Sequence, residues 1–378
     1  MTTTIRQKSA VRRTNVDRFL TGIRVVLIAM LVIGLLAFVA QQINPTNPFA
    51  SWVNPDANRL TGPALRDLII SGLNLGVMYG LIALGYSMVY GVLGFINFAH
   101  GEVFMVAVMS SWITSEKLFE AGLWEDFFIP SLLLTVMIAI VVSTTTAVVM
   151  ERIAYRPLRG SPRLIPLITS IGVSFFLQNV AIGLFGPGAK RYPQLPEWLT
   201  ARRTLLWIPG VEVEGTKILV LVVAGVSMAM LWYYVERTKT GKAMRAVAED
   251  KEIAALMGID VDKTIVRTFA IGGAMAGVAG ILWGLLFRSV VATTGFLPGI
   301  KAFTAAVVGG VGNLGGSMAG GVSLGTAESL GPLLLLEPMG VKGPTQLKDA
   351  VAFVLLIAVL LFKPSGLFGE RLSAEDRT

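Results

Sequence analysis

The chain has 378 residues, of which 54% are hydrophobic and 15% are charged, whereas soluble domains carry about 25% charged residues. A soluble fold cannot bury so much apolar surface. The formal net charge of +8 does not indicate nucleic-acid binding, because the Lys and Arg residues are confined to short segments between long uncharged runs. With no Cys and a single His, His100, the chain offers neither disulfides nor a Cys or His metal cluster. We therefore expect an all-α membrane protein that binds no metal, no cofactor and no nucleic acid.

Uncharged runs of about 20 residues, the length that a helix needs to cross the ~30 Å hydrocarbon core of a bilayer, occur along most of the chain. They cover residues 25–43, 68–101, 127–150, 164–189, 218–235, 268–287 and 302–327. Residues 103–115 extend the second run into a 48-residue region whose only formal charge is Glu102. At about 1.5 Å per residue this region is too long for one crossing, so we predict two spans there. The last run, 350–362, has only 13 residues, so its helix must begin before Asp349. The expected fold is a polytopic transmembrane helical bundle of about eight spans.

The distribution of basic residues orients these spans. Loops on one predicted side carry 20 Lys and Arg residues, and loops on the other side carry 12 over greater lengths. Because basic residues are enriched in cytoplasmic loops, both termini are predicted to lie in the cytoplasm, with the protein in a bacterial inner membrane.

Polar residues interrupt the 48-residue region at Asn97, His100 and Glu102. A charge in the middle of a span costs about 2.5–3.5 kcal/mol on insertion scales, so such residues tend to face the bundle interior. The chain turns either near Gly91 and Gly94, which places Glu102 within a span, or at residues 97–101, which places it at a re-entrant turn. Our hypothesis is that these three residues line or gate a translocation path. In the alternative, His100 and Glu102 pair with each other or cap a broken helix.

The cytoplasmic segment 236–267 has 7 basic and 6 acidic residues around a short apolar pattern. Met244, Val247 and Ala248 fall at helical spacing, and a second apolar face precedes Gly258, which is a plausible helix stop. That second face consists of Ile253, Leu256 and Met257. The pattern predicts an amphipathic helix between two spans. It either lies on the lipid headgroups or docks onto a cytoplasmic partner through apolar anchors.

Residues 302–331 carry a glycine density that a continuous single span tolerates poorly. The glycines are Gly309, Gly310, Gly312, Gly315, Gly316, Gly320, Gly321 and Gly325. Eight crossings return the chain to its starting side only if this region enters and leaves on one face, so we expect a re-entrant hairpin or two closely packed helices. Because interrupted helices mark substrate paths in many transporters, we expect path-lining residues here, with close helix packing as the alternative. The candidates are Gly309, Gly310, Gly312, Asn313, Gly315 and Gly316.

Within the cytoplasmic segment, residues 252–258 read EIAALMG, which is similar to the EAA loop of ABC-importer permeases, with Ile253 in place of the first Ala. Four further segments strengthen this likeness: GLIALGYSMVYGVLGFINFAHGEVFM, ERIAYRPLRGSPRLIPLITSIGVSFFLQN, AVVGGVGNLGGSMAGG and FKPSGLFGE. In this order they resemble the permease family of high-affinity branched-chain amino-acid ABC importers, of which urea permeases are close relatives. The resemblance covers roughly residues 66–371.

The resemblance implies a half-transporter of the type II ABC-importer fold. It would pair with a second, identical or related permease, two cytoplasmic ATPases and a periplasmic or lipid-anchored solute-binding protein. The sequence has no G-x-x-x-x-G-K-[ST] phosphate loop, so ATP and Mg are expected on the ATPase chains and no enzymatic activity on this one. The resemblance also implies that segment 236–263 couples ATPase closure to the spans. Its candidate residues are Ala243, Val247, Glu249, Asp250, Glu252, Ala254, Ala255, Leu256, Met257 and Gly258.

The expected organisation has four parts. They are a basic cytoplasmic tail (1–24), the first span with an external connector (25–66), the permease domain (67–371) and a cytoplasmic tail (372–378). The expected function is import of branched-chain amino acids or a related small polar solute, and the alternative is a permease for urea or short amides. A channel or secondary transporter that works without an ATPase is the rival from another class, and it should carry more ionisable residues in its spans than Glu102 alone. Arg288 and Lys301 flank a predicted external loop, where they mark the interface or contact the binding protein.

Overall fold

The computed structural model describes residues 15–43, 62–162, 164–204, 212–337, 341 and 343–369. The tail predicted at residues 372–378, residues 1–14 of the predicted N-terminal tail and most of the predicted external connector lie outside this range. The described part is almost entirely helical, which confirms the predicted all-α bundle. The longer helices are α1 (Asn15–Ile43), α3 (Gly62–Leu93), α4 (His100–Glu120), α6 (Phe128–Met150), α7 (Leu164–Phe185), α9 (Gly215–Arg237), α12 (Val261–Phe287), α13 (Phe296–Gly309), α14 (Leu314–Gly331) and α15 (Lys348–Phe362).

Short elements join these helices. They are α5 (Leu123–Asp126), α8 (Glu197–Thr200), α10 (Lys239–Glu249), α11 (Lys251–Leu256), the π-helices η1 (Glu151–Tyr155) and η3 (Pro332–Leu336), and the 3-10 helices η2 (Arg156–Leu158) and η4 (Pro344–Leu347). Four strands form two antiparallel pairs, β1 (Lys190–Arg191) with β4 (Ser289–Val290), and β2 (Arg202–Thr204) with β3 (Glu212–Glu214).

Eight helices in the described ranges are long and apolar enough to cross a membrane, which agrees with the predicted number. They are Phe19–Ala40, Pro63–Leu93, Phe128–Leu158, Leu164–Phe185, Gly215–Arg237, Val261–Phe287, Leu314–Leu336 and Pro344–Phe362. The 48-residue region divides into the helices α3 and α4, but α4, which was predicted as a second span, is not among these eight, and Leu314–Leu336 of the glycine-rich region is. The glycine-rich region forms two packed helices, α14 and the shorter α13 of 14 residues, so its predicted interruption is also present.

Helix α6 shows why these helices suit lipid rather than water. Every fourth residue from Ser131 to Ala147 is buried, and these residues are small or polar: Ser131, Thr135, Ala139, Ser143 and Ala147. The large apolar side chains point outward, with Leu133 64% exposed. Small buried residues let helices approach closely, and Ser143 Oγ donates a 2.8 Å hydrogen bond to the Gly273 carbonyl of α12. A soluble helix has the opposite distribution.

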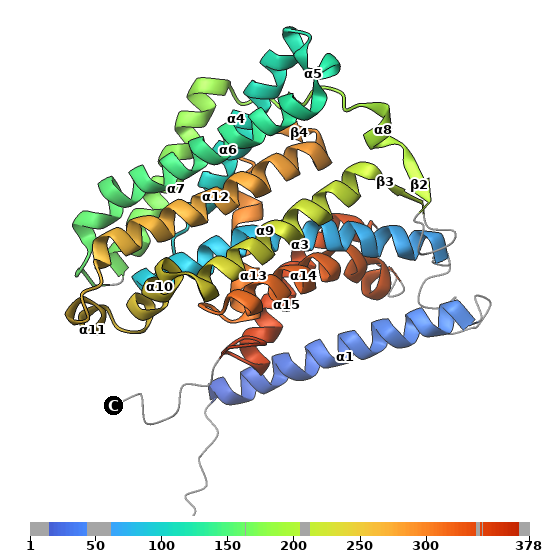
Figure 1. Ribbon diagram of the computed structural model, residues 1–378. Coiled ribbons are helices and arrows are strands. Elements are labelled where there is room, and N and C mark those ends of the chain that lie inside the picture. The colour runs from blue at the N-terminus through green and yellow to red at the C-terminus, as the bar shows by residue number, and fades with distance from the viewer. Residues whose placement is uncertain are drawn as a thin grey trace, which may run out of the picture.

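Helix α3 lies at the centre of the bundle (Figure 1). It packs between α12 and α9 on one side and α13 and α14 on the other, while α4, α6 and α7 lie beyond α12. Helix α1 lies at the edge, along η3 and α15, and is mostly exposed. At its closest approach, a Cβ on Gly34 would lie 3.1 Å from the Leu335 carbonyl oxygen.

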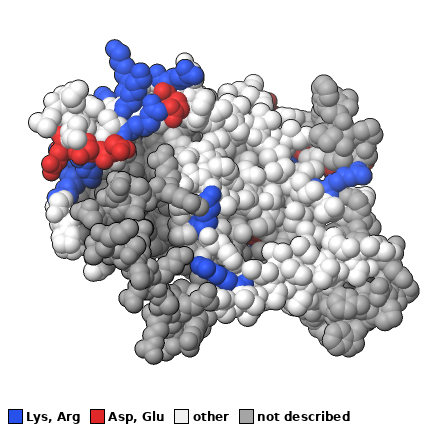
Figure 2. Space-filling view, turned by 90° about the horizontal axis from the view of Figure 1, so that it is seen from below, with Lys and Arg blue, Asp and Glu red and all other residues white. Residues whose placement is uncertain are grey.

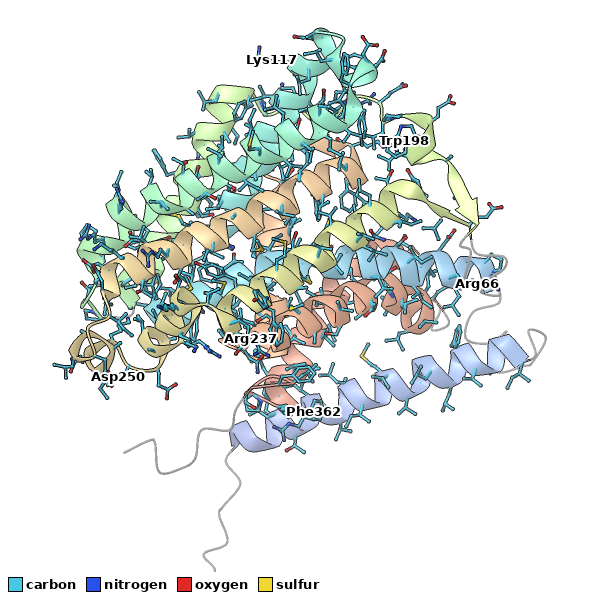
Figure 3. The ribbon with its side chains drawn as sticks, viewed as in Figure 1. Arg66, Lys117, Trp198, Arg237, Asp250 and Phe362 are labelled. Atoms are coloured by element: carbon cyan, nitrogen blue, oxygen red, sulfur yellow. The ribbon has the colours of Figure 1, made fainter. Side chains whose placement is uncertain are left out.

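One end of the bundle carries the charged helices α10 and α11. Helices α10 and α11 lie at one end, at the left of Figure 1, and most of the charged side chains in Figure 2 gather at the left, whereas the middle is largely uncharged. We call this the α10–α11 end. Asp250 lies there in Figure 3, while Arg66 and Trp198 lie toward the other end of the bundle. The strand pairs and α8 belong to that opposite end.

Candidate functional site

The predicted amphipathic helix is two short helices, α10 and α11, and this corrects the expectation of one. The interruption is at Asp250, whose side chain caps α11 by accepting hydrogen bonds from the backbone N–H of Glu252 (2.8 Å) and Ile253 (2.9 Å). Helix α10 begins similarly, because Thr238 Oγ1 accepts from the Gly241 N–H. Gly258, at φ +83°, follows the end of α11 as predicted. Asp250, with its extended backbone (φ −150°, ψ 117°), thus separates α10 from α11.

The two apolar faces of the predicted pattern differ in burial. Met244 and Val247 of α10 are buried against the bundle, whereas Ala248, which the pattern assigned to the same face, is exposed. On α11 the second face points outward, with Ile253 59%, Leu256 86% and Met257 78% exposed. The other candidate coupling residues divide in the same way. Ala254 is buried and Ala243 is half-buried, while Glu249, Asp250, Glu252, Ala255 and Gly258 are exposed.

The chain turns between α3 and α4 at residues 94–99, which overlap both of the positions that the sequence left open. Gly94 has φ +79°, and α4 starts at His100, so Glu102 lies in the first turn of α4. Its carboxylate is 1% exposed. Oε1 accepts hydrogen bonds from Gln178 Nε2 (2.7 Å) and Ser174 Oγ (3.2 Å), both on α7. Oε2 has no hydrogen-bond partner within the described ranges and lies at the start of α13, 2.8 Å from where a Cβ on Gly295 would be.

His100 does not pair with Glu102, because side chains two positions apart on a helix point in different directions. Its ring lies edge-on to Tyr86, with the ring centroids 4.9 Å apart. It also fills the space that the missing side chain of Gly85 leaves on α3, since a Cβ there would lie 2.2 Å from His100 Nε2. His100 thus packs α4 closely onto α3.

Asn97 is buried in the 94–99 segment and contacts a part of the chain that sequence reasoning did not select. Its Oδ1 accepts a 2.6 Å hydrogen bond from Tyr155 Oη, at the end of η1. Ser174, Gln178 and Tyr155 were therefore missed as partners of the polar constellation. A signal for α7 was present, because Ser170, Ser174 and Gln178 recur every fourth residue in an otherwise apolar run.

The glycine-rich candidates lie at the other end of α13. Gly309 ends α13, and Gly310 (φ +110°) and Gly312 (φ +91°) make the turn into α14, whose N-cap is Asn313. Asn313 Oδ1 accepts from the Gly316 N–H at 2.8 Å. A Cβ on Gly309 would lie 2.0 Å from the Gly316 carbonyl oxygen, so the two helices touch here through backbone. Gly315, which follows the cap, is exposed.

The structure does not bring the two groups of path candidates together. Gly101, in the first turn of α4, lies against the start of α13, where a Cβ on it would be 2.7 Å from the Gly295 carbonyl oxygen. The glycine turn follows the last residue of α13, about 21 Å farther along the helix axis. Helix α13 therefore borders both groups.

Lys301 does not lie where the sequence predicted it. The sequence placed it at the edge of an external loop, but α13 begins at Phe296, so Lys301 is in a helix and only 5% exposed. It forms ion pairs with Glu328 of α14 and Asp349 of α15. Arg288 does lie between elements, at φ +54°, and pairs with Glu214 at 3.0 Å.

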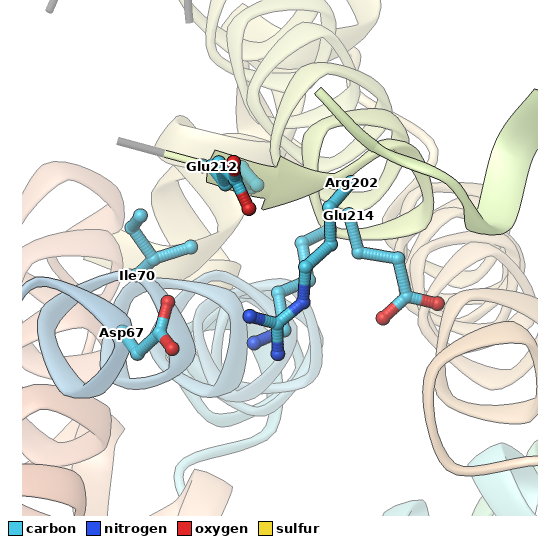
Figure 4. A pocket seen from close by; sticks show the side chains of 7 residues that line it. Asp67, Ile70, Arg202, Glu212 and Glu214 are labelled. Atoms are coloured by element: carbon cyan, nitrogen blue, oxygen red, sulfur yellow. The ribbon is translucent and has the colours of Figure 1, made fainter. Parts of the chain in front are cut away.

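A small polar pocket lies at the opposite end from α11 (Figure 4). Its lining consists of Asp67, Ile70, Arg202, Glu212, Val213, Glu214 and Lys217. Its volume of about 20 Å³ holds roughly one water molecule, so it is too small for an amino acid.

The sequence of the chain was compared with known families. The family described as "Branched-chain amino acid transport system / permease component" matches residues 68–360. The chain belongs to this family. The resemblance seen in the sequence is therefore confirmed, and the protein is a multi-pass membrane permease.

Relatives of the permease include two bacterial proteins. The high-affinity branched-chain amino acid transport system permease protein BraD of Pseudomonas aeruginosa is 42% identical over 304 residues, which cover 80% of this chain and 95% of that protein. LivH of Escherichia coli, with the same description, is 39% identical over 304 residues, covering 80% and 94%. Among solved structures, PsaBC from Streptococcus pneumoniae in complex with Fab matches with a TM-score of 0.41 and 15% identity, over 78% of this chain and 91% of that one.

Proposed function

We propose that this permease is the membrane-spanning subunit of an ATP-driven importer for branched-chain amino acids or a related small polar solute. The names of BraD and LivH support the substrate class, since they describe high-affinity branched-chain amino acid transport. The family match favours this function over a channel or secondary transporter that works without an ATPase. A permease for urea or short amides is the nearest alternative within the proposal.

The observation that carries the ATP-driven part is the exposed apolar face of α11. Leu256 and Met257 are 86% and 78% exposed at the α10–α11 end of the bundle, on a helix flanked by charged residues. Fully burying one such side chain contributes about 1.5–3 kcal/mol, so this face suits insertion into a groove of another protein. We assign that groove to an ATPase subunit, with ATP and Mg held there. Glu249, Asp250 and Glu252 surround the apolar face and would fix its register on basic ATPase residues.

The remaining assembly follows from the same proposal. Two ATPase subunits would bind two permease subunits, this chain and an identical or related partner, and a periplasmic or lipid-anchored binding protein would deliver the solute to the opposite end. The α10–α11 end then faces the cytoplasm of a bacterium. Helix α1 begins and α15 ends toward that same end, since Arg24 donates a hydrogen bond to the Leu361 carbonyl, which supports cytoplasmic termini and an inner-membrane location.

The translocation path is proposed to follow α13, because α13 borders both groups of candidates. Its face at Ile300, Phe303 and Val307 is left half-buried by this chain. Asn97, His100 and Glu102 would line the path near the start of α13, and the turn at residues 309–316 would line it near the end. A second permease facing this side would complete the wall.

The experiment that tests the function is reconstitution of the permease with its cognate ATPase, permease and binding-protein subunits in proteoliposomes. ATP-dependent uptake of leucine, isoleucine or valine is the expected result. Leu256→Asp and Met257→Asp should abolish copurification of the ATPase, because each places a charge in the groove. Leu123→Asp, at an exposed leucine of α5 near the opposite end, is the matched control and should keep it. Uptake that persists without the ATPase would contradict the proposal.

A further inference from the structure

The segment that joins α6 to α7 contacts both functional regions of the permease. It consists of η1, η2 and Arg159, residues 151–159, and we call it the connector. Its first turn is a π-helix that continues α6. π-Helices are rare and often occur at functional sites.

On one side the connector holds the start of α12. Asp262, in the first turn of α12, accepts a 2.8 Å hydrogen bond from Arg156 Nη2 and a second bond from Arg159 Nη1. Arg159 also pairs through Nη2 with Glu151, whose side chain is fully buried. Because the Arg156 and Asp262 side chains are more than half exposed, the Arg159–Glu151 pair is the stronger part of this link.

Asp262 is also close to the coupling helices along the chain. Gly258 follows α11 and is four residues before Asp262. The Ile259 N–H donates to the Ala254 carbonyl of α11, and the Asp260 side chain caps α12. No flexible linker separates α11 from α12, so a displacement of α11 shifts the backbone at Asp262.

On the other side the connector holds the segment before α4. Tyr155, four residues after Glu151, donates its hydroxyl to Asn97 Oδ1 at 2.6 Å. Its ring packs edge-on against Phe95, with the centroids 5.5 Å apart, and is tilted against the ring of Phe269 of α12, with the centroids 5.8 Å apart. Tyr155 is 1% exposed and Asn97 2%, so this contact is made away from water.

Together these contacts, with the η1 backbone that joins Glu151 to Tyr155, link Asp262 through Arg159 to Asn97. Resting on the function proposed above, we infer that the connector transmits movement of the coupling helices to residues 94–99. Arg159, Glu151 and Tyr155 are then positioning residues: they act on the path through Asn97 and the start of α4. Coupling of this kind is shown only when an element with two arrangements responds to both sites. The 94–99 segment must therefore be measured both with and without ATP-driven movement of the coupling helices.

The test uses the whole importer complex and a thiol reporter. Because this chain has no Cys, an introduced Cys is the single thiol that this chain carries. Ile96→Cys introduces one thiol in the 94–99 segment. Its rate of maleimide labelling is compared between the nucleotide-free complex and the complex trapped with ATP and vanadate. With the native connector we expect the two rates to differ by about fivefold or more, the lower end of usual coupling between sites.

Four variants are then added to the reporter, one of them as a control. Tyr155→Phe removes one hydroxyl and keeps the ring contacts, and Asp262→Asn removes a half-exposed charge, so both should fold and bind the ATPase. Both should abolish the ATP-dependent difference in labelling, and Asp262→Glu should restore it. Tyr192→Phe is the matched control, because it also loses a buried hydroxyl bond, 2.6 Å to Ser111 Oγ, near the opposite end of the bundle. It should keep the difference.

The inference is overturned if Tyr155→Phe and Asp262→Asn keep the full difference, or if Tyr192→Phe loses it equally. It is also overturned if the native connector shows no difference in a complex that takes up substrate. A complex that neither binds the ATPase nor takes up substrate would contradict the proposed function itself. Measuring uptake with the native sequence therefore shows whether the inference about the connector or the proposed function has failed.

Discussion

Lys301 Nζ lies 2.7 Å from Glu328 Oε1, and both side chains are buried between helices α13 and α14. The same ammonium group lies 2.6 Å from Asp349 Oδ1 and 3.4 Å from Tyr79 Oη. Helix α13 has only 14 residues, and these contacts hold it against α14, α15 and α3. The position of α13 matters because it borders both groups of path candidates.

Removing the ammonium group should therefore be costly. We expect Lys301→Met to lower the free energy of unfolding by roughly 3–5 kcal/mol, because the Glu328 carboxylate is left buried without a counter-charge. The double variant Lys301→Met with Glu328→Leu should recover most of this loss. Thermal or denaturant unfolding in detergent measures both. Asp349→Asn, at a side chain 39% exposed, is the control and should cost less than about 1 kcal/mol. Equal losses for Lys301→Met and Asp349→Asn would contradict the assignment.

Glu102 gives a test of the path itself. Glu102→Gln keeps an oxygen for Gln178 and Ser174, so the chain should still assemble with the ATPase, but it removes the charge at the start of α13. We expect uptake to fall roughly tenfold, which corresponds to about 1.4 kcal/mol. Ser174→Ala, which removes only the longer 3.2 Å hydrogen bond, should reduce uptake much less. Normal uptake by a normally assembled Glu102→Gln complex would remove Glu102 from the path.

Most of the membrane spans could be predicted because they contain a long uncharged run bounded by charges. Asp349 showed that the last helix must begin earlier than its apolar run, and α15 begins at Lys348. Hydropathy could not show where Lys301 lies, because a charge that is paired inside the bundle and a charge in a loop look the same in one sequence. Its partner Glu328 is 27 residues away and Asp349 is 48 residues away, so the pairing depends on how three helices pack.

The candidate site could likewise be predicted in its local pattern but not in its long-range contacts. The apolar pattern identified Leu256 and Met257, and their exposure on α11 is what a docking face requires. It could not show that Asp250 would cap a second helix, since the same residue also suits the surface of one continuous helix. The contact of Tyr155 with Asn97 joins residues 58 apart, and no local pattern encodes it.

The start of α12 should respond to acid. The pKa of Asp260 is lowered from its ordinary value of 3.8, first by the hydrogen bond from the Lys263 backbone N–H and then by the Lys263 side chain. A lowered pKa in the folded state means that the stabilisation is complete above the ordinary value and is lost as the pH falls through the folded pKa. Thermal midpoints of the native chain should therefore decline below about pH 4 more steeply than those of Asp260→Asn, whose neutral amide still caps the helix. Parallel declines would show that this cap does not contribute.

The glycines of α14 make the last prediction, because the sequence allowed them to mark either a path or close packing. Gly321 faces α3, and a Cβ there would lie 2.5 Å from the Gly80 Cα and N atoms, which are backbone and cannot turn aside. We expect Gly321→Ala to lower the free energy of unfolding by about 1–3 kcal/mol, the usual cost of overpacking. Gly183→Ala on α7 is the matched control, since no atom lies within 4 Å of its Cβ position, and it should unfold like the native chain. If both variants unfold alike, α3 and α14 are not in backbone contact at Gly321.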